Sequence, residues 1–450
     1  MTGDSYSYPW NLEKRCTRNR RGAFFEILRG SNPRPPRAKR DKDGITLFLC
    51  LVVYCRVCGL IVGCQLKKQL SIFMANNLLN EARAAKKDEF YTQFYDIELE
   101  MEAYLDYNPD VFRGKTVLLP CDDPEWSNFT KYFAQNFEDL GLKKLISTSY
   151  APESMTYKNG VQLSLFETLS LKYDKDKTKT HGKIFILTDD TTGDGIINLD
   201  DLQWDYLEGD GDFRSDEVRK LRDEADIIIT NPPFSLFREF LAWIVEAKKQ
   251  FIIIGNINCV TYKEVFPLIQ NNSVWMGCTI HSGDREFGVP DEYPLKAAGW
   301  RVDEKGKKYI RVKGVRWYTN IDHGRRHQPL MLMSVADNIK YSKHKEIRGK
   351  QYETYDNYDA IEIPYTDSIP SDYKELMGVP ISFLDKYCPE QFEIIGMAKR
   401  GAGDPALKSK VYTRNDAPNY SDLNATPTIK GIDGVLRNTY PRILIRKKTN

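Results

Sequence analysis

The chain has 450 residues, of which 28% are charged and 41% hydrophobic, and its formal net charge is +2. This is ordinary globular composition, and the length allows two domains or one large domain with additions. A net charge this close to zero indicates no particular binding partner. Any nucleic-acid-binding surface must therefore be a local cluster of positive charge.

The first 73 residues differ from the rest of the chain. They hold five of the nine cysteines and an apolar run at residues 45–64 that is just long enough to cross a bilayer. Arg56 interrupts that run, and an arginine in mid-span costs roughly 2.5–3.5 kcal/mol. Met74 opens a segment that reads like the beginning of a soluble protein. We therefore expect residues 1–73 to be an N-terminal extension, either from a mis-assigned start or, alternatively, as a membrane segment.

Beyond Met74, helical and strand patterns follow one another. Helical spacing is expected to residue 87 and at residues 94–104, 129–140, 235–245 and 261–269, with Ser235 as an N-cap, and apolar runs predict strands at residues 116–119, 144–147, 183–187, 226–230, 250–255 and 274–280. This alternation predicts an α/β fold with a Rossmann-like sheet, whose parallel strands are joined by right-handed crossovers. Ligands of such sheets bind at the carboxyl ends of the strands.

The segment that follows the strand at residues 226–230 carries the strongest chemical signal. It reads Asn231, Pro232, Pro233 and Phe234. Two successive prolines fix the backbone and remove two amide donors, so the carbonyl oxygens near them remain acceptors. An amino group held by the Asn231 side-chain oxygen and the Pro232 carbonyl would donate both hydrogens and keep its nitrogen lone pair for attack. The competing interpretation is a rigid strand-to-helix turn.

This segment resembles the signature of the amino-methyltransferases, (Asp/Asn/Ser)-Pro-Pro-(Tyr/Phe/Trp) after an apolar strand. In that class the tetrad binds a flipped-out base, and the methyl group passes directly from S-adenosyl-L-methionine to the amino nitrogen. Extruding a base costs a few kcal/mol, and stacking on Phe234 would offset about 1–3 kcal/mol of that cost. The resemblance thus implies catalytic roles for all four residues.

The resemblance narrows to the EcoRI-type adenine methylases of type II restriction-modification systems and covers most of residues 86–396. Residues 90–93 resemble that family's cofactor motif, although alone they would read as the start of an amphipathic helix. The turn at residues 120–129 reads as in the family and lacks the glycine-rich loop of most methyltransferases. The residues implied to bind the cofactor are Phe90, Tyr91, Thr92, Gln93, Asp122, Asp123, Asn128, Asp212 and Phe213.

Two details of the cofactor site depend on single segments. Related enzymes place an Asp-Phe pair where this chain has Asp212 and Phe213, the carboxylate accepting from the cofactor's adenine amino group and the ring packing on the adenine. The alternative for this acidic glycine loop is an ordinary solvated turn. Residues 147–150 lack the acidic residue expected to bind the ribose, which leaves ribose recognition without an assigned residue.

The basic part of the chain lies beyond residue 281. Residues 301–350 contain 14 Lys or Arg and 5 Asp or Glu. Within them Arg325, Arg326 and His327 suit contacts with DNA phosphates or base edges, and the alternative is a solvated basic loop. His323 and His327 are spaced for one helix face, but the residues between them and the absence of carboxylate or cysteine neighbours argue against zinc. We expect no metal.

Together these features predict an adenine-specific DNA methyltransferase. The catalytic domain is expected at residues 74–280 and a target-recognition region at residues 281–450. The enzyme would act as a monomer on N6 of adenine in double-stranded DNA in the bacterial cytoplasm, and a cognate restriction endonuclease would not form a stable complex with it. The few, widely spaced cysteines after Met74 suit that reduced compartment. The alternatives are methyl transfer to RNA adenine or to a protein glutamine, and a catalytically silent DNA-binding protein of the same fold.

Overall fold

In the computed structural model, the described residues belong to one compact unit. The structure describes residues 92–120, 122, 127–151, 172–280, 284–289, 299–400, 407 and 409–448. The expected extension at residues 1–73, the helix expected before residue 87, and three expected cofactor residues, Phe90, Tyr91 and Asp123, lie outside these ranges. Within the described ranges, no helix combines the length and the apolar character that crossing a membrane requires.

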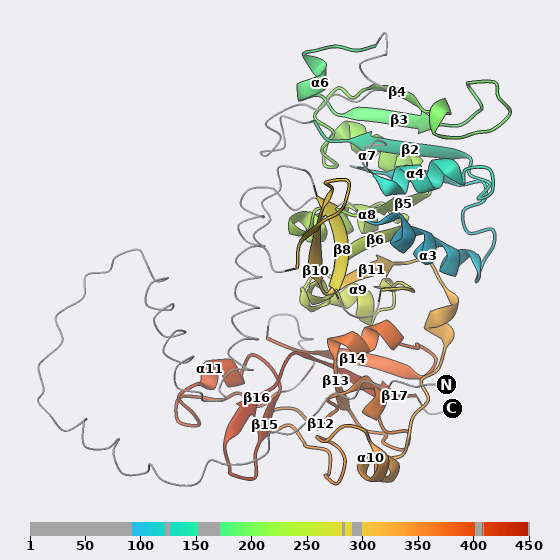
Figure 1. Ribbon diagram of the computed structural model, residues 1–450. Coiled ribbons are helices and arrows are strands. Elements are labelled where there is room, and N and C mark those ends of the chain that lie inside the picture. The colour runs from blue at the N-terminus through green and yellow to red at the C-terminus, as the bar shows by residue number, and fades with distance from the viewer. Residues whose placement is uncertain are drawn as a thin grey trace, which may run out of the picture. The chain divides into compact units, whose positions relative to one another are not determined.

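An eight-stranded sheet forms the centre of the described residues, in the order β4-β3-β2-β1-β5-β6-β11-β7 (Figure 1). Its strands are β1 (Thr116–Leu119), β2 (Lys144–Ser149), β3 (Lys183–Leu187), β4 (Gln203–Tyr206), β5 (Ile227–Thr230), β6 (Gln250–Asn256), β7 (Trp275–Met276) and β11 (Val315–Thr319). Strand β1 pairs in parallel with β2 and β5, and β5 pairs in parallel with β6. These four strands therefore end together, at what we call the carboxyl edge of the sheet, and begin together at the amino edge.

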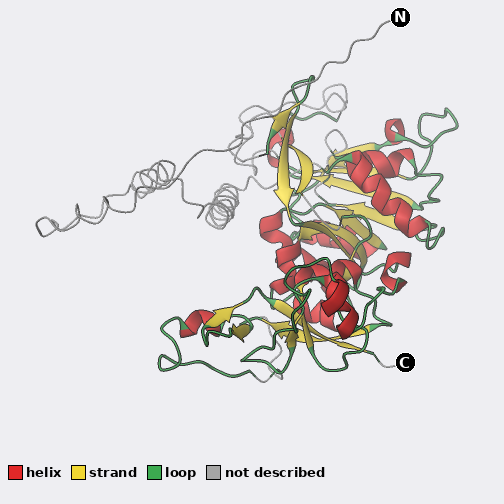
Figure 2. Ribbon diagram, turned by 60° about the horizontal axis from the view of Figure 1, so that its bottom comes forward, coloured by secondary structure: helices red, strands yellow, loops and turns green. Residues whose placement is uncertain are grey.

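Helices cover both faces of this sheet, red against its yellow strands in Figure 2. One face packs against α3 (Phe94–Leu105) and α4 (Asn128–Gln135), and the other against α7 (Asp216–Glu224), α8 (Phe237–Glu246) and α9 (Phe266–Gln270). Successive strand residues face opposite sides of the sheet. Val117 and Leu119 lie in the core cluster that includes α3 and α4, and Leu118 lies in the cluster that includes α7, α8 and α9. Burial on both faces explains why these strands read as continuous aliphatic runs.

Most expected elements are confirmed with small changes of bounds. The strands at residues 116–119 and 183–187 have the expected limits, whereas the one expected at residues 274–280 is reduced to β7. The helix expected at residues 261–269 is a 3-10 turn, η4 (Ile257–Thr261), followed by α9. The prediction that Ser235 caps a helix is wrong, because Ser235 lies inside a 3-10 turn, η3 (Phe234–Leu236), and α8 begins after Leu236 without a side-chain cap.

The expectation that all strands pair in parallel is wrong for four of the eight, because β3, β4, β7 and β11 have only antiparallel neighbours. Strand β3 is antiparallel to β2 and β4, and β11 is antiparallel to β6 and β7. Residues 188–202 join β3 to β4 with only a 3-10 turn, η2 (Leu199–Asp201), and antiparallel neighbours need no crossover helix. Strand β11 comes from the region expected to recognise DNA, so the sheet is not confined to residues 74–280.

Three smaller sheets complete the described strands. They contain β8 (Asp284–Val289), β9 (Arg301–Val302) and β10 (Lys308–Lys313); β12 (Ile361–Glu362), β13 (Met377–Pro380), β14 (Phe392–Ala398) and β17 (Arg442–Lys447); and β15 (Thr428–Lys430) and β16 (Leu436–Asn438). The remaining helical elements are α6 (Lys177–Thr180), α10 (Val335–Tyr341), α11 (Tyr420–Leu423), η5 (Gly324–His327), η6 (Thr366–Ser368) and η7 (Ile381–Lys386). Met377 and Ile443 of the four-stranded sheet share one core cluster with Phe240 and Trp243 of α8.

Candidate active site

The Asn-Pro-Pro-Phe segment begins where β5 ends, at the carboxyl edge. Strand β5 is buried along its whole length and lies between β1 and β6. The hydroxyl of Thr230 donates to the carbonyl oxygen of Pro120 at 3.0 Å, which joins the end of β5 to the end of β1. Asn231 therefore stands beside the turn that the sequence assigned to the cofactor.

The prolines and a 3-10 turn fix the backbone of this segment. Pro232 is buried, and Asn231, Pro233 and Phe234 are partly buried. The carbonyl of Pro233 accepts from the amide of Leu236 at 2.9 Å and so closes the turn. Phe234 packs against the core on the α3 and α4 face. The segment is thus a rigid turn, and this conformation is compatible with the other interpretation of the sequence, a catalytic tetrad.

A buried polar network shapes the turn after β1. The Asp122 carboxylate accepts from the Ser127 hydroxyl at 2.7 Å, and Ser127 caps α4 by accepting from the amide of Phe129 at 3.1 Å. The hydroxyls of Thr130 and Ser147 both donate to the carbonyl oxygen of Asp122. Because Ser147 belongs to β2, the network ties the ends of β1 and β2 together at the carboxyl edge. Polar side chains thus hold the described residues at the two ends of this turn, Asp122 and Ser127.

The two segments predicted to bind the cofactor meet at this turn. The side-chain amide of Asn128 donates to the carbonyl oxygen of Thr92 at 2.6 Å. Thr92 is 4% exposed, and its hydroxyl has no hydrogen-bond partner among the described residues. Gln93 follows it directly and occupies the N-cap position of α3. A buried hydroxyl without a partner among the described residues fits a site that is completed by a polar ligand.

A buried carboxylate that the sequence did not reveal anchors α3. Glu100 is 0% exposed and accepts from the amides of Cys278 at 2.7 Å and Thr279 at 2.8 Å. Burial raises the pKa of Glu100, although these hydrogen bonds act in the opposite direction. A Cβ on Gly277 would overlap this carboxylate, so the glycine permits the contact. Glu100 thereby fixes the helix that starts directly after Thr92 and Gln93.

The loop that holds Asp212 lies against the end of β2. Gly211 has φ +82°, and a Cβ there would lie 2.4 Å from the carbonyl oxygen of Ser149, so only glycine fits. The Asp212 carboxylate accepts from the backbone amide of Arg214 at 2.8 Å and from its guanidinium at 2.6 Å. The hydrogen bond that the guanidinium donates to the Asp212 carboxylate raises the pKa of Arg214. The structure places Asp212 beside the end of β2, with its carboxylate paired to Arg214.

Phe213 lies in the core beneath this loop. Its ring is 4% exposed and contacts Phe240 edge-to-face at 5.1 Å and Trp243 at 5.6 Å between centroids. This packing favours a supporting role for Phe213 over the adenine-stacking role that the resemblance implied.

Comparison with known proteins identifies the family. Residues 78–448 match the family described as "Adenine-specific methyltransferase EcoRI". The chain belongs to this family. The type II methyltransferase M.EcoRI of Escherichia coli is 42% identical over 324 residues, which are 72% of this chain and 90% of that protein. M.MpnI, a type II methyltransferase of Mycoplasma pneumoniae, is 31% identical over 375 residues, which are 82% of this chain and 98% of that protein. No solved structure is significantly similar.

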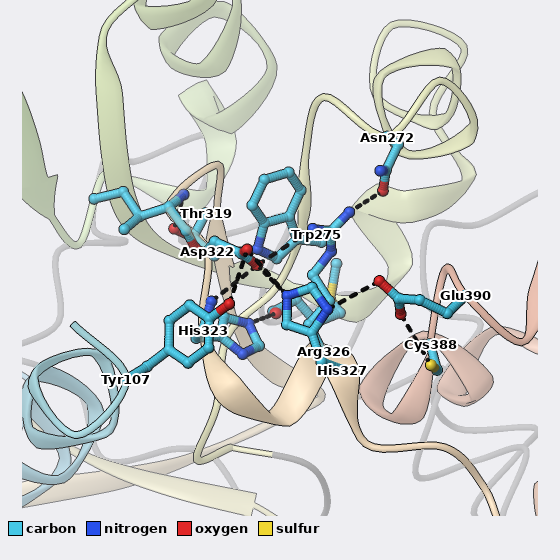
Figure 3. Close-up of polar contacts among 12 residues, drawn as sticks. Tyr107, Asn272, Trp275, Thr319, Asp322, His323, Arg326, His327, Cys388 and Glu390 are labelled. Carbon is cyan, nitrogen blue, oxygen red and sulfur yellow. Dashed lines mark hydrogen bonds and ion pairs between the residues drawn. The ribbon is translucent and has the colours of Figure 1, made fainter.

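The residues that were expected to contact DNA lie at the amino edge of this adenine-specific methyltransferase. Strand β11 is antiparallel to β6, so the chain leaves it at the edge opposite Asn231. Arg326 is 8% exposed, lies 3.3 Å from Asp322, and covers the Trp275 ring at 3.8 Å (Figure 3). Its interactions are within the protein, and the structure favours a structural role over the predicted contact with DNA.

The neighbours of Arg326 are held in the same way. His327 lies between Asp322 at 3.0 Å and Glu390 at 2.9 Å (Figure 3). Arg325 donates to the carbonyl oxygens of Cys278 and Asp385, each at 3.3 Å. The expectation that the histidines lack carboxylate neighbours is wrong, because Asp322 directly precedes His323 and forms a hydrogen bond with His327, and Glu390 reaches His327 from 63 residues further along the chain. Even so, no group of three or more His, Cys, Asp or Glu in the described ranges is arranged to hold a metal ion.

Proposed function

We propose that this methyltransferase transfers the methyl group of S-adenosyl-L-methionine to N6 of an adenine flipped out of duplex DNA. The observation that carries the proposal is the Asn-Pro-Pro-Phe segment at the end of β5, joined to the end of β1 by the 3.0 Å hydrogen bond from Thr230 to Pro120. A base at Asn231 and a methyl donor at the turn after β1 would be neighbours at one edge of the sheet.

The tetrad binds and orients the base in this proposal. The Asn231 side-chain oxygen and the Pro232 carbonyl accept the two hydrogens of the adenine amino group, which leaves the nitrogen lone pair directed at the methyl group. Phe234 stacks on the flipped ring, a contact that contributes about 1–3 kcal/mol. No general base is required, because the ammonium product can lose its proton to solvent after transfer.

The residues at the carboxyl edge fit the cofactor. S-adenosyl-L-methionine supplies an electrophilic methyl group on a sulfonium. The buried Thr92 hydroxyl and the adjoining Asn128 and Gln93 offer polar contacts, together with the turn at Asp122. We assign Asp212 to the same site, with Phe213 supporting its loop from below, and retain Phe90, Tyr91 and Asp123 from the sequence.

The names of the relatives support a proposal for the biological setting. Both relatives reported above are named type II methyltransferases. We therefore propose that the chain works as a monomer on double-stranded DNA in the bacterial cytoplasm. There it would protect sites from a cognate restriction endonuclease without forming a stable complex with it.

The test is transfer of labelled methyl from S-adenosyl-L-methionine to duplex DNA by the full chain, followed by nucleoside analysis. We expect N6-methyladenine from the parent, none from Asn231→Ala, and a partial rate from Asn231→Asp, because aspartate also occurs in the class signature. Cofactor affinity should be equal in all three proteins, since Asn231 contacts the base. Label found in RNA or in a protein glutamine, with none in DNA, would overturn the proposal in favour of those substrates.

A further inference from the structure

We infer that the outer face of the three-stranded sheet β8-β10-β9 is a DNA-binding surface that holds the phosphate backbone beside the flipped adenine. This inference rests on the proposed function and adds to it a place for the duplex. It also replaces the basic residues that the sequence suggested, which lie at the opposite edge of the large sheet.

The position of β10 relative to the tetrad comes from its connection to the large sheet. The Asn256 side chain at the end of β6 donates to the carbonyl oxygen of Lys313 at 2.8 Å, and the amide of Ile257 donates to that of Gly314 at 2.6 Å. Strand β6 is the direct neighbour of β5, with Thr230 paired to Ile253. Strand β10 therefore reaches the carboxyl edge at the end of β6, one strand away from β5 and Asn231.

The inner face of this small sheet is fixed to the core. Phe287 and Val289 of β8 and Ile310 and Val312 of β10 are at most 8% exposed and belong to the same cluster as α3 and α4. Because side chains alternate along a strand, the intervening residues point outward. The buried side chains of the inner face therefore hold the three strands in place, and the outer face does not need a ligand to become ordered.

The outer face is basic. Arg311 and Lys313 of β10 are exposed, and Arg301 of β9 lies next to them across the sheet through its pairing with Tyr309. Residues 284–289 and 299–314, which supply the three strands and the turn between β9 and β10, contain seven Lys or Arg and four Asp or Glu, an excess of three positive charges in a protein whose whole net charge is +2. Glu286 of β8 lies opposite Arg311 on the same outer face and pairs with Arg301. Cations concentrated on one exposed face suit DNA phosphates, and their placement beside the active site makes the duplex the fitting partner.

The connection between β9 and β10 is preformed. Asp303 accepts from the amides of Lys305 at 2.9 Å and Lys307 at 2.8 Å, which closes the turn. Arg301 lies over the Tyr309 ring at 4.1 Å and pairs with Glu286 of β8. Ordering of side chains and loops opposes binding, so a surface already held in place binds DNA at a lower entropic cost.

The experiment compares two double variants of the full chain. Arg311→Gln with Lys313→Gln removes two charges from the proposed surface. Arg113→Gln with Lys143→Gln is the matched control, because both residues are exposed and precede β1 and β2 at the amino edge. The dissociation constant for duplex DNA is measured over a series of salt concentrations, together with cofactor affinity and kcat at saturating DNA.

We expect the first variant to bind DNA about tenfold more weakly at low salt. The slope of log Kd against log salt should decrease by about 2, since each phosphate contact contributes about 0.9. Cofactor affinity and kcat should stay at the parent values, as should all properties of the control. An unchanged Kd and slope, or an equal loss of affinity in the control, would overturn this inference. Methylation of DNA by the parent would in that case still support the proposed function. A parent that methylates only RNA or protein would instead remove the proposed function itself.

Discussion

At the scale of single residues, Thr92 is the most informative position outside the tetrad. Its hydroxyl is buried and has no partner among the described residues, and its carbonyl holds Asn128 at 2.6 Å. Leaving a buried hydroxyl unsatisfied costs about 1–3 kcal/mol. The place of Thr92 next to the turn after β1 therefore supports the proposal that the cofactor binds this hydroxyl.

Replacing Thr92 with valine tests this role, because valine keeps the shape and removes the hydroxyl. We expect cofactor affinity to fall about 3- to 10-fold, the equivalent of one hydrogen bond. The thermal midpoint of the cofactor-free protein should be unchanged or higher. Titration calorimetry and thermal unfolding measure the two quantities, and Thr92→Ser, which keeps a hydroxyl, should retain most of the affinity. Loss of stability with unchanged affinity would show that the hydroxyl serves the fold alone.

At the scale of elements, the end of β6 controls where α8 begins. A Cβ on Gly255 would lie 2.4 Å from a ring carbon of Phe237, and Phe237 is 1% exposed and is the first residue of α8. The 3-10 turn with Phe234 immediately precedes that helix. A displacement of the Phe237 ring is therefore transmitted over a few residues to the tetrad.

We expect Gly255→Ala to lower the free energy of unfolding by about 1–3 kcal/mol, the usual range for an overpacked core. It should also lower kcat/KM for DNA, because the turn after Pro233 shifts. Gly324→Ala is the control, since its Cβ would meet Tyr107 at an ordinary 3.4 Å. Urea unfolding and initial methylation rates check both effects. Equal, small effects from the two substitutions would refute the close contact at Gly255.

The elements also show what a sequence can and cannot reveal. Strand β5 was evident because a strand buried on both faces is a continuous aliphatic run, and the tetrad was evident because its residues are consecutive. The direction of β3 and the insertion of β11 between β6 and β7 were not, because pairing depends on partners distant in the chain. Glu100 had no recognisable signal, since its partner Cys278 lies 178 residues away. The charge of Arg326 was visible in the sequence, but its burial was not.

At the scale of the whole described unit, ion pairs connect the large sheet to the C-terminal region. Arg316 of β11 pairs with Asp385 of η7 at 2.7 and 2.9 Å, and both side chains are less than 8% exposed. Burial raises the pKa of Asp385, and Arg316 opposes that shift. A buried pair of this kind contributes little net stability, but either partner alone would be an uncompensated charge. The pair therefore fixes how β11 and the region after residue 377 fit together.

A second connection depends on pH. Protonated His327 donates to Asp322 and Glu390, and Tyr107 stacks on it at 5.7 Å. The hydrogen bond to Asp322, followed by that to Glu390, raises the pKa of His327 above its usual 6.5, while burial lowers the pKa of neighbouring His323. A histidine whose pKa is raised on folding contributes stability that is complete below the unfolded pKa and is lost as pH rises through the folded pKa. For His323 the sign is opposite, and its effect lies at and below pH 6.5.

The stability of the protein should therefore decline as pH rises from about 6.5 through the raised pKa of His327. His327→Gln keeps a hydrogen-bonding side chain but cannot be protonated, so this variant should lose most of the decline above pH 6.5 and keep the pH dependence below it. Urea midpoints at intervals between about pH 5 and pH 9 measure both slopes. High salt should reduce the parent's decline, because the side chain is partly exposed and the charges are screened. A decline of equal size in the variant would place the titrating group elsewhere, and would leave the contact between the amino edge and Glu390 as packing that does not respond to pH.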